Sequence, residues 1–263
     1  MCDRIPIRLV YHLYVPNGEF GSFMDVHWNC LRYYSHLFTE SIFVLCMENP
    51  EDFDRIKSIE KHIIGLGFNN VIFKVIKNSQ YREGLTLKNE VVDKMNDIDG
   101  LTFFAHSKGD SNLMSDNSDN LGYWISSMYY YNLEFLDIVK YKLIEGFYLA
   151  SGFLVFVNKN ILNNKFGYCF SGSFFWMNTQ RLYDYIKLYG NGDTDYLKIF
   201  DRVYAENFIG NVAYLFKIWS PGRSTEYCDD YKNVLARIKE ITYTDEIYNS
   251  FIDFHNKIAL GNG

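Results

Sequence analysis

Short apolar runs alternate with amphipathic segments through the first part of the chain. The apolar runs have the length and continuity of buried strands and cover residues 7–15, 41–47, 70–76 and 101–105. The segments between them carry apolar residues at helical spacing, which predicts helices over 23–37, 53–66 and 86–95. This alternation is typical of an α/β fold, in which helices cover both faces of a mostly parallel sheet.

The pattern changes after residue 110. It predicts helices over 121–143, 181–188 and 205–216, strands over 146–157 and 169–178, and a tail of two helical segments over 231–260. We find no internal repeat, no low-complexity segment and no linker rich in proline, glycine and serine. We therefore expect one compact body, in which residues 1–110 form a nucleotide-binding half and residues 111–263 form a second half with a C-terminal helical tail.

Composition narrows the class of partner. The net charge is −6, and no block rich in lysine and arginine is present. Binding to a nucleic-acid backbone needs clustered cations, so we exclude nucleic acid as the main partner. A small phosphorylated ligand needs only a few cations in one pocket. The hydrophobic share of 48% supports a large core, and some of the 22 Tyr and 22 Phe residues are free to stack on sugar rings or bases.

The cysteines and the apolar segments bear on location. Five cysteines are scattered along the chain without a Cys-x-x-Cys pair, which favours reduced thiols and argues against a zinc site. The first residues lack a basic region followed by a long apolar core, and the longest apolar stretch, residues 147–157, is too short to span a bilayer. We expect a cytoplasmic protein without a transmembrane segment, and peripheral association with a membrane surface stays open.

The end of the apolar run at 101–105 is the strongest candidate site. His106, Ser107, Lys108 and Gly109 follow that run directly. Ligands of open α/β sheets bind beyond the carboxyl ends of the strands. Lysine suits a phosphate, histidine donates a hydrogen bond or binds a metal, and glycine lets a ligand approach the backbone. The alternative is a capped strand end with a solvated lysine and a locally packed histidine.

Two further segments carry candidate chemistry. Glu206 lies at the start of a predicted helix, where it is either a general base or a first-turn acid stabilised by the helix dipole. Ser171, Gly172 and Ser173 precede bulky aromatic residues; such small residues let a ligand reach the backbone. Trp176 either stacks on a sugar or lines the core.

Two acid pairs are interpreted as turns. Asp97 and Asp99 precede a strand instead of following it, which puts them at the wrong end of the sheet for a ligand. Asp193 and Asp195 follow a glycine in a predicted loop. We assign no metal ligand.

Several of these segments occur in a characteristic order. The chain presents, in turn, Arg82 to Leu87, His106 to Gly109 with Ser111, Trp124, Ser171 to Trp176, and Ala205-Glu206. In these motifs and their spacing it resembles a group of predicted bacterial and viral glycosyltransferases related to polysaccharide and lipopolysaccharide synthesis proteins. The likeness spans approximately residues 5 to 215. It implies a GT-A-like, Rossmann-like fold that binds a nucleotide-sugar donor in its first half and a glycan or glycoconjugate acceptor in its second.

The resemblance also implies roles for individual residues. It assigns Lys108 and His106 to the diphosphate of the donor and Glu206 to the base of an inverting transfer. Contacts to the donor are implied for Tyr11, His12, Arg82, Thr86, Ser107, Gly109, Ser111, Gly172, Ser173 and Trp176. Of these, Tyr11 and His12 would contact the nucleotide, Arg82 a phosphate or the base, and the last three the sugar or acceptor pocket.

One departure from the family concerns the metal. The fold that the resemblance implies carries a metal-binding aspartate pair after the fourth strand, whereas His106, Ser107 and Lys108 occupy that place here. Lys108 would then neutralise the leaving diphosphate where other enzymes use a cation. A need for Mn²⁺ or Mg²⁺, held by His106 with Asp110, stays open.

Two other functions remain compatible with the sequence. A nucleotidyltransferase would also bind its nucleotide at the carboxyl ends of such a sheet, but it needs a well-placed pair of metal-binding acids. A non-catalytic sugar-binding module of a polysaccharide assembly would use the many Tyr and Trp residues instead.

Overall fold

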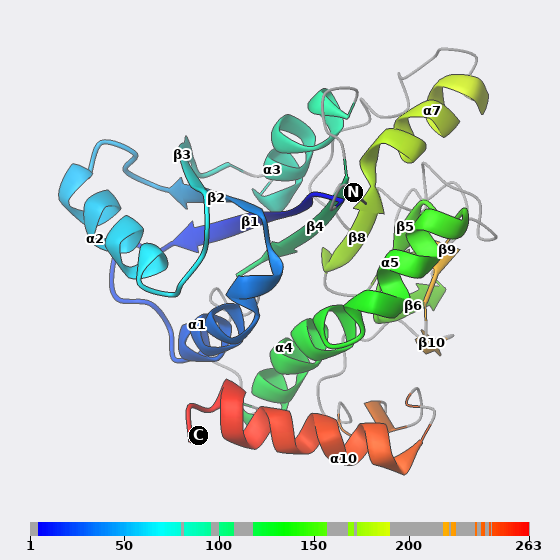
Figure 1. Ribbon diagram of the computed structural model, residues 1–263. Coiled ribbons are helices and arrows are strands. Elements are labelled where there is room, and N and C mark those ends of the chain that lie inside the picture. Colours follow the sequence, from blue (N-terminus) through cyan, green and yellow to red (C-terminus); the bar gives the residue numbers. More distant parts are fainter. Residues whose placement is uncertain are drawn as a thin grey trace.

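A seven-stranded sheet forms the centre of the molecule (Figure 1). The computed structural model describes residues 5–79, 82–95, 100–107, 118–156, 168–170, 173–189, 218–220, 222–224, 235, 238–239, 242 and 244–262. In spatial order the strands are β3 (Val71–Lys77), β2 (Glu40–Met47), β1 (Ile7–Val15), β4 (Leu101–His106), β8 (Phe175–Asn178), β5 (Leu149–Ala150) and β9 (Ile218–Trp219). Strands β1 to β4 are parallel, and β8 is antiparallel to both of its neighbours. The predicted α/β class with a mostly parallel sheet is confirmed, and strands from both parts of the chain belong to this sheet.

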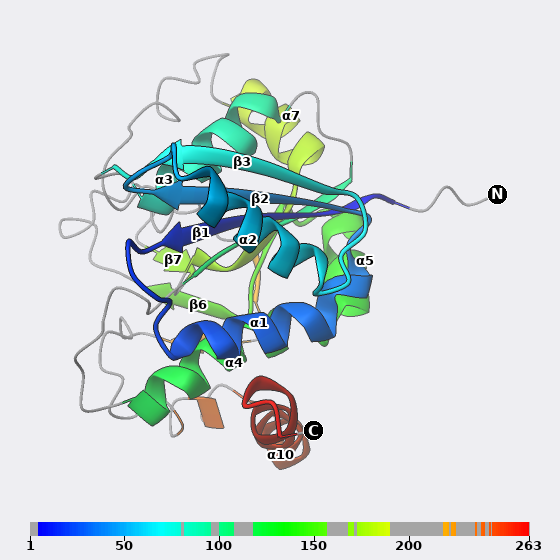
Figure 2. The same cartoon turned by 90° about the vertical axis from the view of Figure 1, so that its left-hand side faces the viewer.

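Helices cover both faces of the sheet. Figure 2 shows α3 and α7 on one side and α1, α4 and α10 on the other. The helices are α1 (Phe23–Tyr34), α2 (Phe53–Ile64), α3 (Arg82–Glu90), α4 (Ser118–Leu133), α5 (Leu136–Glu145), α7 (Thr179–Tyr189) and α10 (Asp245–Phe254). The π-helical turn η7 (His255–Ala259) follows α10 and is tied to α1 and α4, because Asn29 donates to the Ala259 carbonyl and Ser126 Oγ lies 2.7 Å from His255 Nδ1. None of the described helices is both long and apolar enough to cross a membrane.

Two predicted strands are each divided in the structure. Residues 146–157 form β5 and β6 (Phe153–Phe156), and residues 169–178 form β7 (Tyr168–Phe170) and β8. With β10 (Gly222–Ser224), β6 and β7 make a second, three-stranded sheet. The division falls at Gly152, whose amide donates to the Asn132 side chain 3.0 Å away and not to a strand. A Cβ at Gly152 would lie 2.7 Å from Tyr131 Cβ, so this close packing of the turn against α4 requires glycine.

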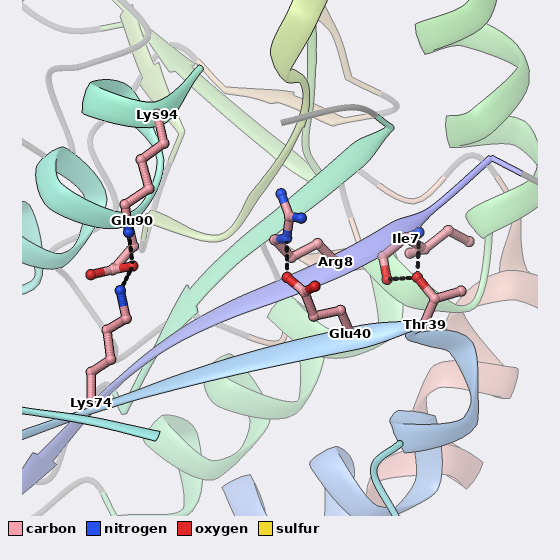
Figure 3. Close-up of polar contacts among 7 residues, drawn as sticks. All are labelled: Ile7, Arg8, Thr39, Glu40, Lys74, Glu90 and Lys94. Atoms are coloured by element: carbon pink, nitrogen blue, oxygen red, sulfur yellow. Dashed lines mark hydrogen bonds and ion pairs between the residues drawn. The ribbon is translucent and has the colours of Figure 1, made fainter. Parts of the chain in front are cut away.

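Ion pairs fasten α3 to the sheet (Figure 3). Glu90 of α3 is nearly buried and pairs with Lys74 of β3 at 2.5 Å and with Lys94 at 2.6 Å. Burial alone would raise the pKa of Glu90, but the hydrogen bonds from the two lysines outweigh it and hold that pKa below its usual range. On the same face, Arg8 of β1 pairs with Glu40 of β2. The Lys74–Glu90 pair holds α3, and hence Thr86, against the sheet, whereas the Arg8–Glu40 pair joins β1 to β2.

The strand order creates a switch point between β1 and β4. From β1 the chain proceeds to β2 and β3 on one side, and then crosses to β4 on the other side. Chain crossovers on opposite sides leave a crevice at the carboxyl ends of the two central strands, which is where open α/β sheets bind ligands. The carboxyl ends of β1 and β4 are therefore the place to look for a site.

Candidate site at the carboxyl ends of β1 and β4

Two histidines from neighbouring strands meet at this edge. His12 of β1 and His106 of β4 are register partners in the parallel ladder, so their side chains leave the same face of the sheet. Both are buried, with 3% and 8% of their surface exposed. The sequence motif from His106 to Gly109 therefore starts beside a second imidazole.

Ser107, the residue after β4, joins the end of β4 to β1 through two hydrogen bonds. Its amide donates to the His12 carbonyl at 2.9 Å, and its hydroxyl accepts from the Tyr14 amide at 2.9 Å. The side chain thus replaces one rung of the ladder at the point where the backbone of β4 ends. Because Lys108 is the next residue in the chain, Ser107 anchors the start of the segment that carries it.

His12 is held as a neutral imidazole. Its Nδ1 lies 2.8 Å from the hydroxyl of Thr86, which is buried on α3. Burial lowers the pKa of His12 to about 4; the nearby Glu83 carboxylate opposes this change and His106 adds to it. Its Nε2 has no hydrogen-bond partner within the part of the chain that the structure describes. At neutral pH His12 therefore offers an uncharged ring nitrogen to a ligand.

We expect His12 to make the protein sensitive to acid. The unfolded chain binds a proton on His12 below pH 6.5, whereas the folded chain does so only near pH 4. The free energy of unfolding therefore rises with pH across this window. When the pH falls from 7 to 5, the His12 contribution lowers that free energy by about 2 kcal/mol. Urea unfolding at the two pH values should show this loss in the wild type and in the exposed-site control His36→Gln, but not in His12→Gln. Equal losses in all three proteins would contradict the assignment.

The start of β8 lies at the same edge. Phe175 pairs with Phe104 in an antiparallel register, so Ser173 lies beside the carboxyl end of β4, and the rings of His106 and Phe174 are 5.6 Å apart. Ser173 adopts a left-handed backbone with φ +55°, and its buried hydroxyl has no hydrogen-bond partner among the described residues. Both features cost stability and concentrate at functional sites.

Hydrogen bonds from Ser151, just after β5, and from Asn132 of α4 hold the segment around Ser173 in place. The Ser151 hydroxyl donates to the Phe174 carbonyl at 2.7 Å. Asn132 accepts from the Gly152 amide through its side chain and from the Trp176 indole through its backbone carbonyl, at 3.0 and 2.8 Å. The strained turn is thus supported on both sides by buried, paired polar groups.

Two predicted ligand contacts are corrected by the structure. Tyr11 precedes His12 in β1 and therefore points to the opposite face, where its hydroxyl lies 3.1 Å from His27 Nδ1 and 3.2 Å from the Tyr129 hydroxyl. Trp176 is fully buried, with ring centroids 4.9 Å from Phe103 and 6.3 Å from Phe38. Neither side chain has surface available to a nucleotide or a sugar, so the core interpretation of Trp176 applies and Tyr11 joins it.

Other predicted residues cannot be placed in the same way. Lys108, Gly109, Asp110, Ser111, Gly172 and Glu206 lie outside the described residues, as do Asp97, Asp99, Asp193 and Asp195. Arg82 begins α3, but its side chain is not described. Of the predicted set, the structure brings His12, Thr86, His106, Ser107 and Ser173 together.

The sequence reading missed two polar residues at the same edge. Glu48 follows β2 and Asn78 follows β3, and the Asn78 amide nitrogen lies 2.6 Å from a Glu48 carboxylate oxygen. The Asn78 backbone amide also donates to the Met47 carbonyl at 2.7 Å. In nucleotide-binding sheets an acid after the second strand commonly accepts hydrogen bonds from the ribose. Glu48 directly follows the apolar run at 41–47, but Lys77 separates Asn78 from the run at 70–76, so the sequence alone does not single out this pair.

The described part of the site holds imidazoles, hydroxyls and an exposed acid. Within the described residues, no group of three or more His, Cys, Asp and Glu side chains is arranged to hold a metal ion. A scan against protein-family models gives no match, and a comparison with curated proteins gives none. The chemistry of the site therefore has to be argued from its own residues: buried imidazoles and hydroxyls at a switch point, followed in the chain by a lysine.

Proposed function

We propose that the protein is a glycosyltransferase of the GT-A type, which moves a sugar from a nucleotide-diphosphate donor to a glycan or glycoconjugate acceptor. The observation that carries this proposal is the meeting of His12, Thr86, His106 and Ser107 at the β1–β4 switch point, immediately before Lys108 in the chain. The motif order that resembles glycosyltransferases supports it independently.

The proposed reaction needs two contributions from the protein, stabilisation of the leaving diphosphate and a base for the acceptor hydroxyl. The acceptor oxygen forms a bond to the anomeric carbon while the bond from that carbon to the diphosphate oxygen breaks, and the electron pair leaves with the diphosphate. Lys108 and His106 stabilise that departing charge. Glu206 takes the proton of the acceptor hydroxyl. The acceptor attacks from the side opposite the leaving diphosphate, and this single displacement inverts the anomeric carbon.

The nucleoside end of the donor would bind at the carboxyl ends of β2 and β3. Glu48 and Asn78, at the ends of β2 and β3, would accept and donate hydrogen bonds to ribose or base. His12, kept neutral by burial, would contact the donor between the nucleoside and the diphosphate without adding charge. Ser173 would face the transferred sugar from the β8 side.

A panel of UDP-, GDP-, dTDP- and CMP-sugars, each with and without Mn²⁺, tests the proposal. We expect one donor to be hydrolysed slowly, and Glu206→Gln to lose transfer while it still binds the nucleotide. Activity without Mn²⁺ would fit the lysine in place of a metal. Glycan binding without nucleotide affinity would replace the proposal with a sugar-binding module, and release of pyrophosphate would indicate a nucleotidyltransferase.

A further inference from the structure

Arg55 of α2 reaches away from its own helix to the loop that follows β1. Its Nη1 donates to the Asn17 carbonyl at 3.3 Å, and its Nη2 donates to the Gly18 carbonyl. The guanidinium also lies 6.0 Å from the centroid of the Phe20 ring. The backbone of Arg55 is itself fixed, because its amide donates to the helix-capping carboxylate of Asp52 at 3.2 Å. A planar fork on two successive carbonyls is a contact that lysine cannot reproduce.

The tip of this loop, residues 17–19, makes few other contacts with the described residues. Asn17, Gly18 and Glu19 are exposed, and nothing lies within 4 Å of a Cβ placed on Gly18. Beyond the tip, the Met24 amide donates to the Gly21 carbonyl at 3.0 Å, and the rings of Phe20 and Trp28 lie 5.8 Å apart. Arg55 therefore holds the carbonyls of Asn17 and Gly18 at the exposed tip of the loop.

The loop starts at the proposed donor site. It leaves β1 two residues after Tyr14, whose amide is held by Ser107. The carbonyl and the following N–H of a trans peptide point in opposite directions. With the carbonyls of Asn17 and Gly18 turned toward α2, the N–H groups of Gly18 and Glu19 point away from it, and neither has a partner within the described residues.

We infer that Arg55 is a positioning residue for the donor nucleotide: it holds the β1–α1 loop so that the Gly18 and Glu19 amides face the bound diphosphate. This role rests on the proposed function. Arg55 does not touch the donor, and it acts through the backbone of residues 17–19. The loop needs this support because its tip, residues 17–19, is exposed and forms no strand or helix, whereas Phe20 beyond the tip packs against Trp28 of α1.

Three variants on α2 test the role. Arg55→Met keeps the aliphatic stem but loses the fork, Arg55→Lys keeps the charge, and Lys57→Met removes an exposed charge from the same helix as a matched control. Without ligand, hydrogen exchange of residues 16–22 should be about tenfold faster in Arg55→Met, with the core strands unchanged. With the donor that the wild type uses, KM should rise about tenfold and kcat should stay within about twofold. Arg55→Lys should fall between, and Lys57→Met should match the wild type.

The outcomes separate this role from the proposed function. If the wild type turns over a donor but Arg55→Met keeps a normal KM or normal exchange in the loop, the positioning role is wrong and the transferase proposal stands. If kcat falls as far as KM rises, Arg55 acts on the chemical step and the role as stated is also wrong. If the wild type turns over no donor, the proposed function is wrong, and the positioning role of Arg55, which rests on it, is wrong as well.

Discussion

Replacing Lys108 by alanine should lower the rate of sugar transfer about 10²- to 10³-fold while the protein stays folded. The reason is the charge that develops on the departing diphosphate. Ser107 anchors the chain at the carboxyl end of β4, and His12 beside it is neutral, so among these neighbours the lysine supplies the fixed positive charge. A loss of this size corresponds to about 3–4 kcal/mol of transition-state stabilisation.

Single-turnover kinetics with a saturating donor measure this effect without interference from product release. Lys77→Ala is the matched control, because Lys77 is an exposed lysine at the end of β3 on the same sheet. It should leave the rate unchanged. A near-normal rate for Lys108→Ala, or an equal loss in both variants, would remove the lysine from the mechanism.

Replacing Trp176 by alanine should destabilise the fold by about 3–5 kcal/mol, the range for large core aromatics. The ring is fully buried between Phe38 and Phe103, and its indole N–H donates to the Asn132 carbonyl on α4. The truncation leaves both a cavity and an unpaired carbonyl. Since Asn132 also holds Gly152, the loss should extend to the turn that supports Ser173.

Denaturant unfolding of Trp176→Ala measures that cost. Tyr141→Ala, at an aromatic residue on α5 that is 57% exposed, serves as the control and should change stability by less than about 0.5 kcal/mol. Trp176→Phe should keep most of the stability and bind the donor nucleotide normally. If Trp176→Phe were as stable as the wild type yet lost donor affinity, the tryptophan would belong to the pocket after all.

The carboxyl edge of the sheet was predictable because it depends on local signals. Apolar runs mark the strands, polar residues follow them, and parallel strands bring their ends to one edge. This logic placed His106 and Ser107 at the carboxyl end of a buried strand, where β4 ends in the structure. It did not distinguish Tyr11 from His12. Neighbours in a strand point to opposite faces, but both faces of β1 are buried and mostly apolar, so the pattern does not show which face carries the ligand.

Other features depend on contacts between distant segments. The break between β5 and β6 follows from the close approach of Gly152 to Tyr131, more than twenty residues earlier in the chain, which no local pattern encodes. The same holds for the strained backbone of Ser173 and for the reach of Arg55 to Asn17. Glu48 and Asn78 were missed for a different reason: single polar residues after strands are common, and only their mutual contact across two strands makes them notable.

The central claim is that the donor diphosphate binds where β1 and β4 end. The most direct measurement is a crystal structure of the protein with the nucleoside diphosphate that it binds best. We predict that the diphosphate lies against Ser107 and the Gly18 and Glu19 amides, with the Lys108 ammonium in contact with a phosphate oxygen. A nucleotide bound at another surface, or a Lys108 side chain directed into solvent with no ligand beside it, would contradict the account.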